Sequence, residues 1–228
     1  MKNKNLYSCG EEIYAALRSQ AKTYLDGLIF FLVVFDFTPE YQRMRYVLEK
    51  LGVIVEVVHL NPAYWDEQLR RASLLGDFVY VENNGFWIGE NKPNIEPEKD
   101  INGVLGKASM FTDCRSFGVI TYLMYCNFDV RGKNIVIEDD DVYLLEKLIA
   151  AGATVTVINS DTREKYQKMQ DADLIITSPK KEGIKINMYP RHCPVIDMRK
   201  HCVNCEDRDV IQNCYWLFNL IGVLAQLW

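Results

Sequence analysis

The chain has 228 residues, of which 49% are hydrophobic and 25% are charged, and its formal net charge is −5. A chain of this length and apolar content can bury a real core, in one large domain or in two small ones. The charge is mild and forms no basic tract, so neither nucleic acid nor an anionic membrane surface is expected as a partner.

Cysteine usage and the apolar runs indicate the compartment. The chain has seven cysteines, an odd number, which does not suggest a disulfide framework in a chain of this size. Its first residues, MKNKNLYSCGEE, lack the apolar core of a signal peptide. The longest apolar run, Leu28–Phe35, is far too short to span a bilayer. We therefore expect a cytoplasmic protein without a membrane partner.

Helices and strands are expected to alternate in the first part of the chain, because helical and β-branched apolar patterns follow one another. The predicted elements are a helix over Glu11–Leu25, a strand over Leu28–Phe35, a helix from Thr38-Pro39 to Leu51, a strand over Val53–Val58, a helix from Asn61-Pro62 to Leu75 and a strand over Phe78–Val81. Thr38 is the expected N-cap of its helix. The next segment, Glu82–Gly118, is rich in Asn, Gly, Pro and charge, which is typical of a functional loop or a connection between domains.

The second part of the chain repeats this alternation. The predicted elements are a helix over Val119–Cys126, a strand over Asn134–Ile137, a helix over Val142–Ala151, a strand over Ala153–Ile158, a helix over Thr162–Met169, strands over Leu174–Thr177 and Pro194–Asp197, and a helix over Asp207–Leu227. Two such runs predict an α/β fold with two lobes built on parallel sheets. We find no internal repeat in the sequence.

The stretch Arg131–Ser160 has the strand–helix–strand pattern of a nucleotide-binding half-fold. A phosphate-binding turn needs glycines and exposed backbone N–H groups, but this turn is Glu138-Asp139-Asp140-Asp141, which would repel a phosphate. Capping of the following helix by acidic residues is the plainer interpretation, and a metal-bridged nucleotide is the alternative.

Several stretches match one known family in order. They are the helix GEEIYAALRSQAKTYL, the strand LIFFLVVF with Asp36, Tyr41 with LEKLGV after it, Ile95–Gly103, Thr112–Gly118, Asn127–Gly132, Asp171–Ile176 and Pro194–Asp197. In these stretches the chain resembles the bifunctional methylenetetrahydrofolate dehydrogenase/methenyltetrahydrofolate cyclohydrolase (FolD-type) family, as a divergent member.

The resemblance covers nearly the whole chain and implies a two-lobed α/β fold. An N-terminal parallel-sheet domain over residues 1–105, completed by residues 206–228, would carry the folate chemistry, and residues 106–205 would form a Rossmann-like domain. The C-terminal helix would pack back on the N-terminal lobe. A folate-like ligand, NADP and a homodimer are implied as well.

The resemblance also implies catalytic candidates. The family's Tyr and Lys, four residues apart on one helix, correspond to Tyr41 and Arg45. Tyr41 would stack on or hydrogen-bond the pterin, and Arg45, which is always charged, would stabilise developing negative charge instead of shuttling a proton. Lys99 and Asp100 complete the set. The alternatives are a surface Tyr–Arg pair and an ordinary solvated charge run.

Binding candidates come from positions where the chain departs from the family. Asn102 stands at the pterin-binding acid, where an amide lacks the charge, and Glu82 lies near an absent Gln-Leu-Pro motif. The Gly-rich phosphate loop and the final Pro-Gly-Gly loop are missing. The cofactor-binding candidates that remain are Asn159, Ser160, Thr162 and Ser178.

A short cysteine and histidine cluster is a weak candidate for metal binding. Cys202 and Cys205 have the spacing of metal ligands, and His201 lies beside them. A second Cys-x-x-Cys is missing, so structural thiols are the plainer interpretation and a redox pair is another. We expect no metal.

Three functional hypotheses follow. The first is a divergent methylenetetrahydrofolate dehydrogenase/cyclohydrolase-like protein of one-carbon metabolism, with weak or lost dehydrogenase activity. The second is a non-catalytic relative that acts as a ligand-binding or assembly module. The third is a shikimate-dehydrogenase-like protein, against which the stretch Lys99–Gly103 argues.

Overall fold

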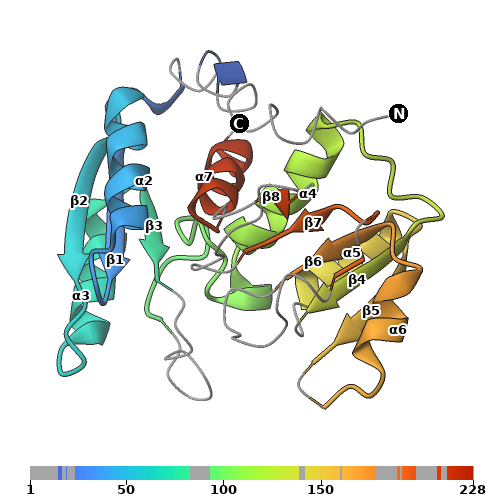
Figure 1. Cartoon of the computed structure of the whole chain (residues 1–228). Coiled ribbons are helices and arrows are strands. Elements are labelled where there is room, and N and C mark those ends of the chain that lie inside the picture. The colour runs from blue at the N-terminus through green and yellow to red at the C-terminus, as the bar shows by residue number, and fades with distance from the viewer. Residues whose placement is uncertain are drawn as a thin grey trace. The chain divides into compact units, whose positions relative to one another are not determined.

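The computed structural model of this chain contains two parallel sheets, each with helices packed on it (Figure 1). The structure describes Ala15, Ala16, Ser19 and residues 24–82, 93–138, 142–159, 161–177, 189–190, 192–198, 210–211 and 215–227. The chain divides into two compact units, which we call the N-terminal unit (Tyr14–Gly118 with Asn219–Trp228) and the Rossmann-like unit (Met1–Ile13 with Val119–Phe218). The predicted α/β class with two parallel sheets is confirmed.

The N-terminal unit is built on a three-stranded sheet with the order β2-β1-β3. Its elements are β1 (Ile29–Val34), α2 (Pro39–Lys50), β2 (Ile54–His59), α3 (Trp65–Leu75) and β3 (Phe78–Val81), all near the predicted bounds. Leu32 in β1 pairs with Val57 on one side and Tyr80 on the other. The central strand is fully buried at Leu32, because it has a neighbour on both edges and α3 packs against it.

Helix α2 shows how the sequence pattern produces this packing. Its buried residues are Tyr41, Met44, Val47 and Leu48, which share one helical face. Pro39 occupies the first helical position, as predicted, because its missing N–H would have no intrahelical partner there. Thr38 is the N-cap residue, but its side chain makes no capping hydrogen bond. Burial of each large apolar side chain on this face stabilises the unit by roughly 1.5–3 kcal/mol.

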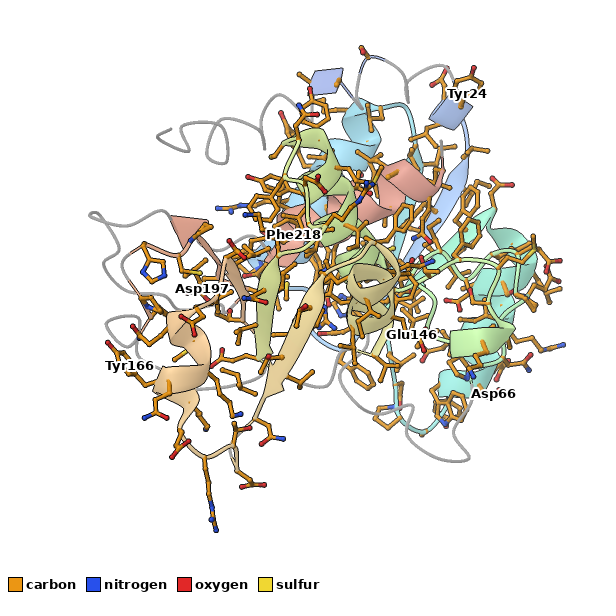
Figure 2. All side chains as sticks on the ribbon, turned by 90° about the vertical axis from the view of Figure 1, so that its right-hand side faces the viewer. Tyr24, Asp66, Glu146, Tyr166, Asp197 and Phe218 are labelled. Carbon is orange, nitrogen blue, oxygen red and sulfur yellow. The ribbon has the colours of Figure 1, made fainter. Side chains whose placement is uncertain are left out.

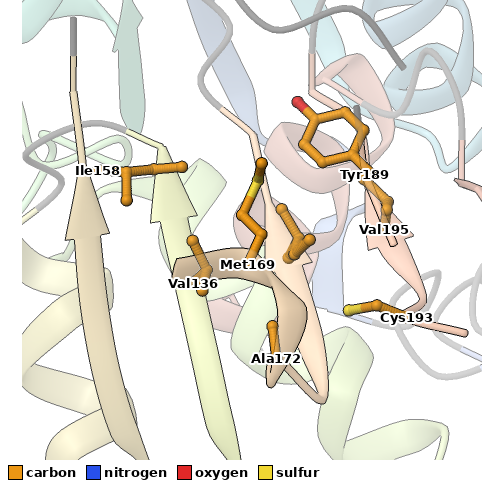
Figure 3. Packing of buried hydrophobic residues seen from close by; sticks show 8 residues of the cluster. Val136, Ile158, Met169, Ala172, Tyr189, Cys193 and Val195 are labelled. Atoms are coloured by element: carbon orange, nitrogen blue, oxygen red, sulfur yellow. The ribbon is translucent and has the colours of Figure 1, made fainter. Parts of the chain in front are cut away.

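The Rossmann-like unit holds a five-stranded parallel sheet with the order β5-β4-β6-β7-β8. Its elements are β4 (Asn134–Glu138), α5 (Val142–Ala150), β5 (Thr154–Ile158), α6 (Lys165–Gln170), β6 (Leu174–Ile176), β7 (Val195–Ile196) and β8 (Val210–Ile211). Val136, Ile158, Met169, Ile175 and Tyr189 are among the residues of its core (Figure 3). Met169 anchors α6 on the sheet with no exposed surface.

The two units repeat the same connections around their central strands. Gly27 donates its N–H to the carbonyl of Gly52 at 2.9 Å, and Gly132 donates to Gly152 at 2.8 Å. Each of these four glycines has a positive φ, between 72° and 90°, which favours glycine because it lacks a Cβ atom. This structural repeat could not be predicted from the sequence, because it consists of a few backbone hydrogen bonds at the ends of helices and strands.

An aspartate closes the same connection in both units. The Asp77 carboxylate accepts the N–H of Ile29 at 2.8 Å, and the Asp173 carboxylate accepts the N–H of Asn134 at 2.9 Å. In each case the acid directly precedes the third strand of the unit and satisfies the first N–H of the central strand. These bonds align the amino ends of the strands.

Two helices contribute residues to both units. They are α4 (Cys114–Tyr125) and α7 (Tyr215–Gln226). Within the N-terminal unit, Gly222 of α7 lies against the backbone of Cys114, where a Cβ atom would overlap the Cys114 carbonyl. Within the Rossmann-like unit, the rings of Tyr122 and Phe218 meet edge to face with centroids 5.3 Å apart. The expectation that the C-terminal helix packs on the N-terminal lobe is confirmed.

The predicted bounds of these two helices were wrong. Helix α4 begins five residues before the predicted start at Val119, because Asp113 caps it. The predicted helix from Asp207 was wrong in its first part, where Val210–Ile211 forms a short strand beside β7. Val and Ile are β-branched, so they favour an extended backbone where a neighbouring strand is available. In the part of the chain that the structure describes, no helix is long and apolar enough to cross a bilayer.

Substitution of Gly222 by alanine tests the close approach of α7 to Cys114. The added methyl group would collide with the Cys114 backbone, so we expect the free energy of unfolding in urea to fall by about 1–3 kcal/mol. Ala150→Ser, at an exposed position of α5, is the control and should stay within about 0.5 kcal/mol of wild type. Equal midpoints for Gly222→Ala and wild type would contradict this packing.

Asp173→Asn tests the acid at the start of β6. The Asn134 backbone N–H, and to a smaller extent Lys133, hold the pKa of Asp173 below its usual value. The ionised group therefore contributes stability above its unfolded pKa, and this contribution is lost as the pH falls through its folded pKa. Urea unfolding at pH 7 and pH 3 should show a smaller acid-induced loss for the variant than for wild type. An identical loss in both proteins would show that the bond has no such role.

Candidate functional site at the carboxyl edge of the N-terminal sheet

Open parallel sheets bind ligands outside the carboxyl ends of their strands, where the chain reverses direction across the sheet. In the N-terminal unit this point lies at the end of β1, because β2 and β3 flank it on opposite sides. The segment Lys99–Leu105 runs beside β3, since Asp100 forms a parallel bridge with Val79. Most of the predicted site residues lie on these elements.

Asn102 extends the edge of β3 with its side chain. Its Oδ1 atom accepts the N–H of Val81 at 2.9 Å, and its Nδ2 atom donates to the carbonyl of Val81 at 2.6 Å. The side chain is buried, with 6% of the residue exposed. An aspartate could accept from Val81 but could not donate to it. This geometry therefore explains the amide at a position where an acid was expected from the family pattern.

Asp100 organises the turn that follows it. Its two carboxylate oxygens accept the N–H groups of Val104 at 3.0 Å and of Leu105 at 2.8 Å. Burial raises the pKa of Asp100, although the N–H groups of Leu105 and Val104 oppose the shift. The residue has no exposed surface. Asp100 therefore holds backbone and does not face solvent as a general base.

Lys99 anchors the same segment to α3. Its Nζ atom donates to the carbonyl of Ser73 at 2.6 Å and lies 3.0 Å from the carboxylate of Glu96. Ser73 lies in the last turn of α3, where carbonyls lack intrahelical partners and a positive charge is favoured. The charge of Lys99 is thus directed at the end of a helix.

Tyr41 and Arg45, four residues apart on α2, differ in burial. Tyr41 is buried, and its ring meets the ring of Tyr80 in β3 with centroids 6.2 Å apart. The Nε atom of Arg45 lies 2.7 Å from the carboxylate of Glu49, and both side chains are more than 40% exposed. A joint role of Tyr41 and Arg45 toward a ligand stays a prediction.

Glu82 joins the ends of two strands. Its carboxylate accepts the N–H of Phe35 at 2.8 Å, and its own N–H is donated to the carbonyl of Val33. The side chain is half-buried at the carboxyl edge of the sheet. Of the predicted substrate-binding residues, Glu82 therefore lies where a ligand at this edge would approach.

Gln226, which the sequence did not single out, connects three segments of the unit. Its Oε1 atom accepts the N–H of Thr112 at 2.6 Å and the hydroxyl of Thr112 at 2.9 Å. Its Nε2 atom donates to the carbonyl of Ile101 and to the carbonyl of Thr112, both at 3.1 Å, and to the sulfur of Cys114 at 3.3 Å. A single glutamine in an apolar helix was the only signal in the sequence.

The thiol of Cys114 belongs to this network and is not a nucleophile. Burial, followed by the charges of Asp113 and Asp100, raises its pKa well above the usual value. The thiol donates to the carbonyl of Ile101 at 3.0 Å. Reactive cysteines are thiolates in electropositive surroundings, so Cys114 is structural.

The carboxyl edge of the Rossmann-like unit is occupied by the chain's own polar groups. Glu138 ends β4, is 6% exposed, and accepts a hydrogen bond from the hydroxyl of Tyr189 at 3.3 Å. Thr177, after β6, donates to the carboxylate of Asp197 at 2.9 Å, and Asp197 lies beside the strands of this unit (Figure 2). Glu138 is therefore the last residue of β4, and the expected capping of α5 by the acids that follow it, Asp139–Asp141, lies outside the described residues.

The cofactor candidates of this unit also bond to each other. Asn159 donates its N–H to the hydroxyl of Thr162 at 2.9 Å, and that hydroxyl donates to the Asn159 side chain at 3.1 Å. Ser160, Ser178 and Asp139–Asp141 lie outside the described residues. A pyrophosphate does not fit beside a buried glutamate at the end of β4, because it needs donors and close backbone approach there.

The weak metal candidates, His201, Cys202 and Cys205, lie outside the described residues. Within the described ranges, no group of three or more His, Cys, Asp or Glu side chains is placed to hold a metal ion. Cys193 lies in the core of the Rossmann-like unit, where burial, followed by the charge of Asp173, raises its pKa to about 12. This thiol stays protonated.

Several known proteins are similar to this two-unit α/β chain. No protein-family model matches it. The bifunctional protein FolD of Staphylococcus haemolyticus is 28% identical over 162 residues, which cover 60% of this chain and 55% of that relative. The chain thus spans about half the length of the curated relatives it matches, at 55%.

Solved structures share the fold at low identity. The bifunctional enzyme FolD of Campylobacter jejuni, a methylenetetrahydrofolate dehydrogenase/cyclohydrolase, has a TM-score of 0.72 at 16% identity, over 98% of this chain and 95% of that one. Trypanosoma brucei FolD, solved with NADP cofactor and an inhibitor, has a TM-score of 0.73 at 12% identity, over 96% and 94%. This chain is therefore similar in sequence to FolD proteins over part of its length, and it shares the fold of solved FolD structures.

Asn102→Asp tests the role of the amide. The variant would place a carboxylate against the Val81 carbonyl, so we expect it to lower the free energy of unfolding at pH 7 by about 1–3 kcal/mol. Protonation at low pH would restore a donor, so the loss should shrink there. Asn61→Asp is the control, since the side-chain oxygen of exposed Asn61 accepts the N–H of Ala63 and an aspartate keeps that acceptor. A loss in Asn102→Asp no larger than that of the control would contradict the role assigned to this amide.

Proposed function

We propose that the chain acts in one-carbon metabolism and binds a folate one-carbon adduct at the carboxyl edge of the N-terminal sheet, with dehydrogenase activity weak or lost. The observation that carries this proposal is the segment Lys99–Leu105, held along β3 beside the switch point of the sheet. The names of the relatives support the ligand class, because they are methylenetetrahydrofolate dehydrogenases and cyclohydrolases.

The residues around this edge favour binding over proton transfer. Lys99 donates to Ser73, Asp100 accepts two backbone N–H groups, and Arg45 forms an ion pair with Glu49. None of these three is poised as a general base toward an incoming ligand. Glu82 and the ring of Tyr41 remain the groups through which a pterin would be recognised, by a hydrogen bond and by aromatic contact respectively.

A non-catalytic ligand-binding or assembly module is the second candidate. It is favoured by the structural roles of Lys99 and Asp100, which leave the scaffold intact without a proton shuttle. Hydrolysis of a methenyl adduct needs no nicotinamide, so the two candidates differ only in whether bound adduct is turned over. A cytoplasmic homodimer belongs to the proposal in both cases.

NADP is part of the family's chemistry, as the Trypanosoma brucei structure with NADP illustrates for that protein. In the present chain the residues at the end of β4 do not fit the pyrophosphate, because Glu138 is buried there. The proposed function therefore contains no step that depends on a nicotinamide cofactor.

Titration with 5,10-methenyltetrahydrofolate tests the proposal. At a hundred times its dissociation constant, a ligand should stabilise the folded chain by about 2.7 kcal/mol, which thermal unfolding detects. Tyr41→Leu, which removes the aromatic ring, should weaken ligand binding about threefold to tenfold. Arg70→Gln, on the exposed face of α3, is the control and should match wild type.

The outcome separates the two candidates. Stabilisation together with decay of the methenyl absorbance supports a hydrolytic activity, and stabilisation without decay supports a binder. No stabilisation by any reduced folate would refute the proposed ligand. Light scattering after gel filtration measures the mass of the assembly, and a monomer would refute the homodimer.

A further inference from the structure

The carboxyl edge of the five-stranded sheet is the place where a dinucleotide would meet this fold. From β4 the chain passes through α5 to β5 on one side, and β6 lies on the other side of β4. The switch point therefore lies at the carboxyl end of β4, where a phosphate group is normally held by glycines and helix N–H groups.

Glu138 lies at this point, and residues of the neighbouring strands lie beside it across the sheet. It pairs with Ile158 of β5, and on its other side Thr177 follows the paired residues Ile137 and Ile176. Thr177 in turn lies beside Asp197, because Ile176 pairs with Ile196. Glu138 is 6% exposed, and Thr177 and Asp197 have no exposed surface.

Hydrogen bonds within the protein hold these groups in place. The hydroxyl of Tyr189 donates to Glu138, so the carboxylate is tied to the core on which Tyr189 packs. The hydroxyl of Thr177 donates to Asp197 and accepts the N–H of Met198 at 2.9 Å. The hydroxyl donors of Tyr189 and Thr177 at this edge are thus engaged with the protein's own acceptors.

We infer that Glu138, held by Tyr189, excludes a dinucleotide from this unit by placing a buried carboxylate where the pyrophosphate would lie. A glycine at the end of the strand leaves space for a phosphate, whereas a glutamate fills that space with a side chain of the same charge as the ligand. The missing glycines remove a binding feature, and Glu138 adds an obstacle. The unit then serves as a folded partner of the N-terminal unit and not as a cofactor domain.

Isothermal titration with NADP alone tests this inference, and it is independent of the proposed folate ligand because no folate is present. Wild type should show no binding up to about 1 mM, where a dissociation constant of 1 mM corresponds to about −4.1 kcal/mol. Glu138→Gln, which keeps the shape and removes the charge, and Glu138→Gly, which removes the side chain, should bind NADP at least about tenfold more tightly than wild type, a change of about 1.4 kcal/mol.

Two further variants serve as controls. Tyr189→Phe retains the carboxylate and should remain without NADP binding, although it loses the hydrogen bond to Glu138. Asp173→Asn removes a carboxylate at the opposite end of the same sheet and should also match wild type. Circular dichroism checks that each variant is folded. If Glu138→Gln does not fold, NADP binding by Glu138→Gly tests whether Glu138 excludes the dinucleotide.

Micromolar binding of NADP by wild type would overturn the inference, since nothing would then be excluded. Folded Glu138→Gln and Glu138→Gly proteins that bind no better than wild type would overturn it as well, because the obstacle would lie elsewhere. Binding gained equally in Asp173→Asn would show a general charge effect and would refute the role of Glu138.

Discussion

The two hydrogen bonds between the Asn102 amide and the backbone of Val81 are the contact on which the N-terminal unit depends. They continue the ladder of β3 with a side chain and hold the segment from Lys99 to Leu105 against the sheet. The carboxylate of Asp100 fixes the turn within the same segment, because it accepts the N–H groups of Val104 and Leu105. A buried amide with both polar atoms bonded stabilises the fold, and a side chain that could not both donate and accept there would lower the free energy of unfolding.

The carboxyl edges of both sheets share this physical logic. In each unit the side chain of an acid near the strand ends is bonded within the protein, as Glu82 accepts from Phe35 and Glu138 accepts from Tyr189. The edge of the N-terminal sheet still presents half-buried Glu82, whereas Glu138 is almost fully buried. This difference underlies the proposal that one unit binds a ligand at its carboxyl edge and the other excludes a phosphate.

Strands β1 to β6 were predictable from the sequence, because their apolar runs and the glycines after helices are local signals. Strand β8 was not, because two β-branched residues within an apolar stretch also fit a helix, and only pairing with β7 decides between them. The role of Gln226 was equally hidden, since its five bonds join segments more than a hundred positions apart. Asp100 and Asn102 were singled out as catalytic and binding candidates, but the partners that the structure shows for them are backbone groups, which no sequence pattern displays.

The central proposal is that this FolD-like chain binds a folate at the carboxyl edge of one sheet and excludes a nucleotide from the carboxyl edge of the other. Saturation-transfer NMR on the whole chain, with 5-formyltetrahydrofolate and NADP present together at equal concentration, tests both halves in one measurement. The account predicts transfer of magnetisation to the pterin protons and none to the adenine or nicotinamide protons. Transfer to NADP, or no transfer to the folate, would contradict it.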